Sequence, residues 1–103
     1  MVAHVIVKLV DEQFMGEFYF QKDPVSLGQR LRKEGQYRTA AEYYSPVEGE
    51  AAAEQAFDIA NNPSRGDERV RIFESQRSVS VGDIVEVDGV PFLCASMGWE
   101  QLA

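Results

Sequence analysis

The distribution of apolar and polar residues along the chain predicts several strands. Apolar residues of both parities fill residues 3–10, a pattern typical of a strand buried on both faces in the middle of a sheet. Residues 14–21 alternate, with phenylalanines on one side, and a polar turn at 11–13 precedes them, so we expect an antiparallel hairpin. Residues 37–44 predict a third strand, and residues 70–72 a short one.

Two stretches carry helix signals. Residues 26–29, Ser-Leu-Gly-Gln, have the form of a capping box and predict a short helix over 27–34 that Gly35 ends. Residues 45–48, Ser-Pro-Val-Glu, are the strongest helix start in the chain, with a capping serine and a proline in the first turn. They predict the principal helix, over 46–61. Its apolar stripe at helical spacing consists of Ala53, Ala56, Phe57 and Ala60.

The last quarter of the chain predicts a β-hairpin. Residues 84–87 and 90–95 are apolar runs joined by Asp88-Gly89, a dipeptide suited to a turn in which both central residues have positive φ. Gly82-Asp83 reads as a turn before it, and residues 97–102 as a last short strand. The expected fold class is therefore α+β, a mainly antiparallel sheet with one principal helix, a short helix and a C-terminal hairpin.

Length and composition are those of one folded domain, which we place at 1–103. The chain has 103 residues, of which 45% are hydrophobic, enough to build a core without disulfides. Its single cysteine fits a reducing compartment, and no apolar stretch is long enough for a signal peptide or a membrane span. We therefore expect a cytoplasmic protein that is not attached to a membrane.

The charges are unevenly distributed, and two interpretations remain open. A basic segment holds Arg30, Arg32, Lys33 and Arg38, whereas the principal helix carries only acidic charges, among them Glu50, Glu54 and Asp58. Both groups are candidate partner-binding residues, with nearby tyrosines available for stacking or for filling a pocket. Alternatively, the arginines pair within the molecule with the acidic helix. The net charge of -7 disfavours nucleic acid as the partner.

Candidate catalytic chemistry is scarce. His4 is the only histidine and lies in a strand pattern, and Cys94 lies in an apolar run typical of a buried small residue. One cysteine and one histidine are too few for a zinc site, and no glycine-rich phosphate loop is present. Asp83, Glu86 and Asp88 could bind a hard cation, but the two aspartates are also natural turn residues. We therefore expect no enzyme, no cofactor and no metal.

One segment resembles a known family. Asn61, then Arg77-Ser78-Val79-Ser80-Val81-Gly82-Asp83-Ile84-Val85, and then Phe92 to Gly98-Trp99 resemble the C-terminal part of YodL-like proteins, which are small proteins of phages and mobile elements. The resemblance spans roughly residues 50–102. It implies an accessory protein but supplies no catalytic residues. In physical terms, the carboxylate of Asp83 can accept backbone N–H groups, and Arg77 can pair with Asp83 or with a helix C-terminus.

These observations lead to two functional expectations. The first is a phage or mobile-element accessory protein that binds another macromolecule, for example an acidic inhibitor of a host nucleic-acid-binding protein. The second is a small nucleic-acid- or nucleotide-binding module that uses the basic residues at 30–38.

Overall fold

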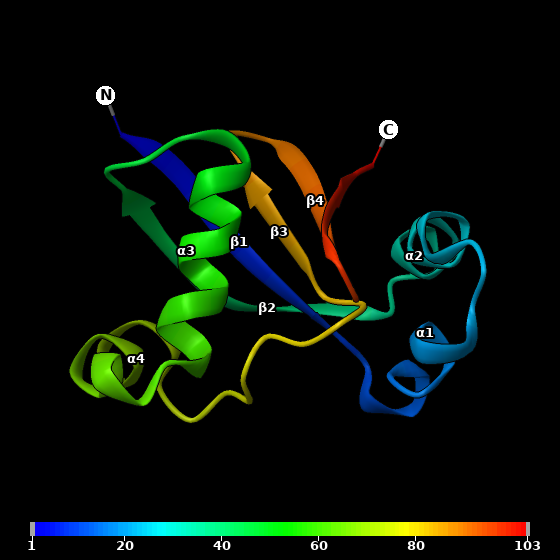
Figure 1. The fold of residues 1–103 in the computed structure, drawn as a ribbon, viewed down its shortest axis with the longest axis horizontal. Helices are drawn as coiled ribbons and strands as arrows, with labels where there is room; N and C mark the ends of the chain where they lie inside the picture. The colour runs from blue at the N-terminus through cyan, green and yellow to red at the C-terminus, as the bar shows by residue number, and fades with distance from the viewer. Residues whose placement is uncertain (1, 103) are drawn as a thin grey trace.

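The computed structural model describes residues 2–102, which form one antiparallel sheet with helices on both faces (Figure 1). The strand order is β2-β1-β3-β4-β5. The strands are β1 Ala3–Val10, β2 Tyr37–Ser45, β3 Ile84–Val87, β4 Val90–Ala95 and β5 Gly98–Gln101. The α-helices are α1 Glu17–Phe20, α2 Pro24–Lys33, α3 Gly49–Asn61 and α4 Gly66–Phe73, with 3-10 turns at Glu12–Phe14 and Pro63–Arg65. The predicted α+β class is confirmed.

Two hydrophobic clusters lie on opposite faces of the sheet. On one face, α3 places its small side chains against Val5, Val7, Val85 and Val87. Because alanines predominate on this side of α3, the helix lies close to the sheet. On the other face, Leu27 and Leu31 of α2 cover one end of the sheet. The residues that they cover are Val10, Ile84, Leu93 and Leu102. The expected central position of β1 is confirmed, because β2 and β3 flank it.

The predicted strand over 14–21 is wrong, because this stretch forms a 3-10 turn followed by α1. Asp11 begins the turn by accepting the backbone N–H of Gln13 at 3.1 Å. Phe14 and Phe18 both pack in the α2 cluster, whereas Phe20, which a strand would place beside them, is 88% exposed. A spacing of four residues fits one helical face as well as one strand face, so the alternation was ambiguous.

The predicted strand at 70–72 is also wrong, because these residues belong to α4. Asp67 and Glu68 in the first turn and Arg71 in the last complement the helix dipole. The helix buries Phe73 completely and leaves Val70 exposed.

Both predicted helices exist, but their starts differ from those expected. α2 begins at Pro24, with Asp23 as the N-cap that accepts the Ser26 N–H at 3.1 Å, so Ser26 is inside the helix. α3 begins at Gly49 instead of residue 46, because β2 continues through Ser45. The Ser45 hydroxyl accepts the backbone N–H of Val47 at 3.2 Å and thus shapes the connection rather than the helix end.

The C-terminal hairpin is confirmed. β3 pairs with β4, and the turn residues Asp88 and Gly89 have φ values of 50° and 82°. β5 adds to β4 after the two-residue turn Ser96-Met97 and forms an edge of the sheet. Within residues 2–102, no helix has the length and apolar character needed to cross a membrane.

Candidate functional site

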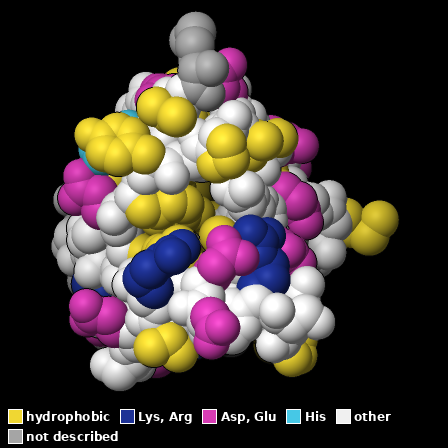
Figure 2. Space-filling view, turned by 90° about the vertical axis from the view of Figure 1, so that its left-hand side faces the viewer, with side chains coloured by type: hydrophobic (Ala, Val, Ile, Leu, Met, Phe, Trp, Pro, Cys, Tyr) yellow, Lys and Arg dark blue, Asp and Glu magenta, His cyan; other side chains and the backbone are white. Residues whose placement is uncertain are grey.

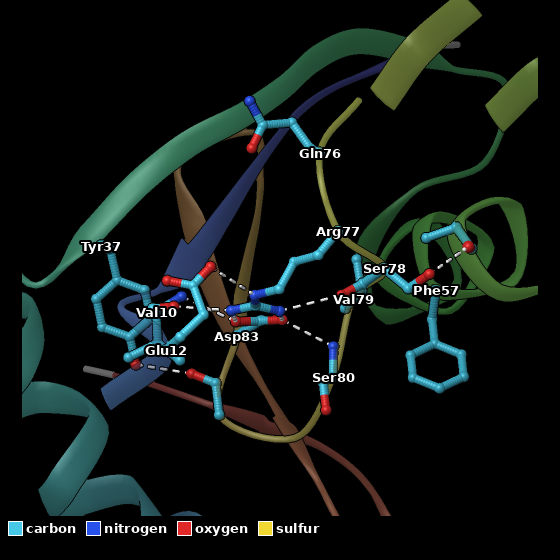
Figure 3. A network of polar contacts seen from close by, with 12 residues as sticks. Val10, Glu12, Tyr37, Phe57, Gln76, Arg77, Ser78, Val79, Ser80 and Asp83 are labelled. Carbon is cyan, nitrogen blue, oxygen red and sulfur yellow. Dashed lines mark hydrogen bonds and ion pairs between the residues drawn. The ribbon is translucent and has the colours of Figure 1, made fainter. Parts of the chain in front are cut away.

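The conspicuous sequence motif at 77–85 forms a buried ion pair (Figure 3). The Asp83 side chain is 0% exposed and accepts four hydrogen bonds. Its Oδ1 accepts the Val10 N–H and Arg77 Nη2, both at 2.8 Å. Its Oδ2 accepts the Ser80 N–H and Arg77 Nη1, both at 2.7 Å. This confirms that Asp83 accepts backbone N–H groups and pairs with Arg77.

This network joins segments that are far apart in the sequence. Arg77 also donates to the carbonyl oxygen of Val10 at 2.7 Å, so the ion pair satisfies both backbone groups at the end of β1. The Tyr37 hydroxyl donates to the carbonyl oxygen of Gly82 at 2.8 Å. The Asn61 amide, at the end of α3, donates to the carbonyl oxygen of Val79 at 3.0 Å. The motif thus stabilises the fold, and the charges of Arg77 and Asp83 pair with each other inside the protein.

The four predicted basic residues do not form one surface. Three of them lie on α2, namely Arg30, Arg32 and Lys33. Arg38 lies opposite Leu9 in the β1–β2 ladder, so its side chain is on the same face of the sheet as Leu9, which is the α3 face. Three of the four contact carboxylates: Arg32 donates to Glu86 at 3.0 Å, Arg38 donates to Glu12 at 2.8 Å, and Arg30 lies 3.9 Å from Glu34 on the surface of α2. Lys8 also contacts Glu86, at 3.1 Å. Arg30 and Lys33 remain exposed on α2.

The three predicted acidic residues on α3 have different surroundings. Asp58 pairs with Arg65 at 2.8 Å, and Arg65 also binds Glu68 at 2.9 Å. The hydrogen bond from Arg65 lowers the pKa of Asp58. Figure 2 shows the side of the molecule on which α4 lies, where basic and acidic side chains are interspersed. Intramolecular pairing therefore accounts for Asp58, but Glu50 and Glu54 are exposed and form no ion pair with the described residues.

A second group of residues meets where α3 approaches β5. Glu54 accepts the indole N–H of Trp99 at 2.7 Å, and the Trp99 ring meets Phe57 edge to face at 6.5 Å. The next residue, Glu100, is exposed on the opposite face of the sheet, and Met97, in the turn before β5, is 94% exposed. We call this surface the acidic edge and define it by Glu54, Phe57, Met97, Trp99 and Glu100.

Two cavities flank the turn at 96–97. One, of about 220 Å³, is lined by Glu54, Phe57 and Trp99 on the α3 side. The other, of about 270 Å³, lies on the α1 side and is lined by Phe18, Tyr19, Pro24, Val81, Met97 and Glu100, among others, with one basic residue, Lys22. Both linings combine apolar and polar side chains, and such mixed linings can bind a side chain of a partner.

Of the acidic edge, the sequence interpretation named only Glu54 as a partner-binding residue and missed Phe57, Met97, Trp99 and Glu100. An available signal was the turn Ser96-Met97, since two-residue hairpin turns usually hold glycine, asparagine or aspartate. A large apolar residue there is exposed by the geometry of the turn.

A metal site finds no support among the described residues, where no group of three or more His, Cys, Asp or Glu side chains is arranged to hold an ion. Asp83 is bound to Arg77, Glu86 to Lys8 and Arg32, and Asp88 accepts the backbone N–H of His4 at 2.9 Å. Cys94 is buried, and burial raises the pKa of its thiol to about 12.

Comparisons with known proteins yield no match, whether with family models, with curated proteins or with solved structures. The fold and the site define this chain as an α+β protein with a five-stranded antiparallel sheet and an acidic edge.

Proposed function

We propose that this chain is a phage or mobile-element accessory protein that acts by binding another protein, and that the acidic edge is the binding surface. The observation that carries this proposal is the combination of exposed apolar and acidic side chains around β5. Met97 is 94% exposed beside two cavities, and Glu54 and Glu100 form no ion pair with any residue in 2–102. Large apolar side chains in such surroundings commonly anchor protein interfaces.

Charge favours a basic partner surface. Residues 42–62 and the residues from 78 onward include no lysine or arginine, and these two segments supply all five residues of the acidic edge. A basic patch on a nucleic-acid-binding protein has the complementary sign, and electrostatic attraction would accelerate the association. Inhibition of such a host protein is the specific version of this proposal.

Affinity capture from a host-cell lysate tests the proposal with two matched triple variants. The first, Glu54→Gln with Met97→Ser and Glu100→Gln, removes two charges and one apolar side chain from the acidic edge. The control, Asp67→Asn with Val70→Ser and Glu74→Gln, makes the same changes at exposed positions in and next to α4. We expect the wild type and the control to retain the same protein, and the first variant to lose it. Retention by all three would contradict the proposal.

The nucleic-acid alternative has its own measurement. Titration with DNA and RNA at low and high ionic strength would show salt-sensitive binding if the exposed Arg30 and Lys33 contact phosphates. We expect no binding at low ionic strength, since Arg32 and Arg38 are already bound to carboxylates.

A further inference from the structure

The outer edge of β5 has free backbone groups. Leu102 donates its N–H to the carbonyl oxygen of Pro91 at 2.9 Å, which shows that the backbone groups of Leu102 face β4. Because alternate residues of an antiparallel strand direct their backbone groups to opposite sides, Trp99 and Gln101 direct theirs away from β4. No backbone hydrogen bond from another part of the described chain reaches these two residues. An edge of this kind can accept a further strand.

The two cavities lie on opposite faces of the sheet beside this edge. The cavity lined by Glu54 and Trp99 is on the α3 face, and the cavity lined by Tyr19 and Met97 is on the α1 face. Successive side chains of an added strand point to opposite faces, so neighbouring residues of one peptide could enter both cavities. This alternation gives the edge a means of selecting sequence in addition to backbone pairing.

The chemistry of the cavities specifies the side chains. On the α3 face, Trp99 offers an aromatic surface, and Glu54, whose Oε2 accepts the indole N–H, has a second carboxylate oxygen for a cation. Lysine or arginine suits this cavity through cation–π contact and ion pairing. On the α1 face, Phe18, Val81 and Met97 offer apolar contacts to a side chain, beside the polar lining residues Gln21, Lys22, Ser96 and Glu100.

We propose that an extended peptide segment of the partner, with a basic residue next to an apolar one, adds to β5 as a sixth strand. The inference rests on the proposed function, whose acidic edge it develops. Each backbone hydrogen bond to the β5 edge contributes to affinity, and the loss of one weakens binding by about two- to tenfold.

A display library of short random linear peptides, selected on the intact protein, is the probe. We expect enrichment of peptides in which lysine or arginine neighbours an apolar residue. N-methylation of an enriched peptide at the alternate residues whose N–H groups face β5 should weaken binding by about two- to tenfold per residue. N-methylation at the intervening residues should have little effect. Enrichment of acidic peptides, no enrichment, or tolerance of N-methylation at every position would overturn the inference.

A pair of protein variants provides an independent check. Gln101→Pro removes an N–H that points away from β4, whereas Gln101→Ala retains it. We expect the proline variant to bind the selected peptide more weakly than the alanine variant, with circular dichroism reporting that both are folded. Equal binding by two folded variants would contradict the inference. If the acidic-edge triple variant loses its partner in the capture experiment but no peptide binds, the proposed function stands and strand addition fails.

Discussion

Replacement of Asp83 by asparagine tests whether the ion pair at 77–83 holds the fold together. The substitution keeps the size of the side chain but removes its charge and replaces one acceptor oxygen with an NH2 group. Each oxygen now accepts one backbone N–H and one arginine N–H, so the new amide must face two donors in either orientation. Two donors without an acceptor cost about 1–3 kcal/mol each, or roughly 2–6 kcal/mol in total.

The loss also leaves the Arg77 charge partly buried without its principal partner. Breaking a buried ion pair by removing one member costs about 3–5 kcal/mol, which lies within the same range. Since domains of this size are stable by only about 5–15 kcal/mol, Asp83→Asn should consume a large part of the free energy of unfolding. Urea unfolding, followed by circular dichroism, measures this free energy and the slope that reports two-state behaviour.

Asp88→Asn is the matched control. Asp88 is exposed, accepts one backbone N–H, and has a φ of 50°, which asparagine tolerates. We expect the control to stay within about 0.5 kcal/mol of the wild type. The reasoning is refuted if Asp83→Asn costs less than about 1 kcal/mol or no more than the control.

Three further predictions concern single contacts. Gly82→Ala should cost more than about 1 kcal/mol in unfolding free energy, because φ is +98° and an added Cβ would lie 2.5 Å from an aromatic ring carbon of α1. The hydrogen bond from Arg38 lowers the pKa of Glu12 from 4.5 to about 2. The stability that this exposed carboxylate contributes is therefore complete above pH 4.5 and is lost as the pH falls toward 2. The urea midpoints of Glu12→Gln and of the wild type should accordingly converge at low pH. Tyr37→Phe should cost about 1 kcal/mol, since its hydroxyl is hydrogen-bonded, whereas Tyr43→Phe should cost less, since no residue in 2–102 bonds its buried hydroxyl; thermal unfolding separates the two.

The parts of the fold that could be predicted depend on local signals. The apolar run in β1 indicated a central strand, although the α3 face of β1 is buried along its length and the other face is fully buried only at Val10. The Asp88-Gly89 turn requires positive φ at both residues. Neither signal depends on the rest of the chain. The Phe14 to Phe20 stretch was misassigned because its spacing fits two structures, and the choice depends on tertiary packing. Phe18 packs against the backbone at Gly82, a residue distant in the sequence.

The site depended on long-range pairing, which sequence adjacency does not reveal. Arg32 and Arg38 are near each other in the chain, but they lie on opposite faces of the sheet, and each finds a carboxylate on another element. The acidic charge of Glu54 was easier to interpret, because the segment around it, like the segment around Glu100, contains no lysine or arginine. A charge in such a segment can be neutralised only by an element that the topology brings near. Here the topology makes β5 an edge strand, so no further strand lies beside it to supply a cation. The acidic charges of Glu54 and Glu100, unpaired among residues 2–102, therefore lie beside the edge of β5 that faces away from β4, which is the edge open to a partner.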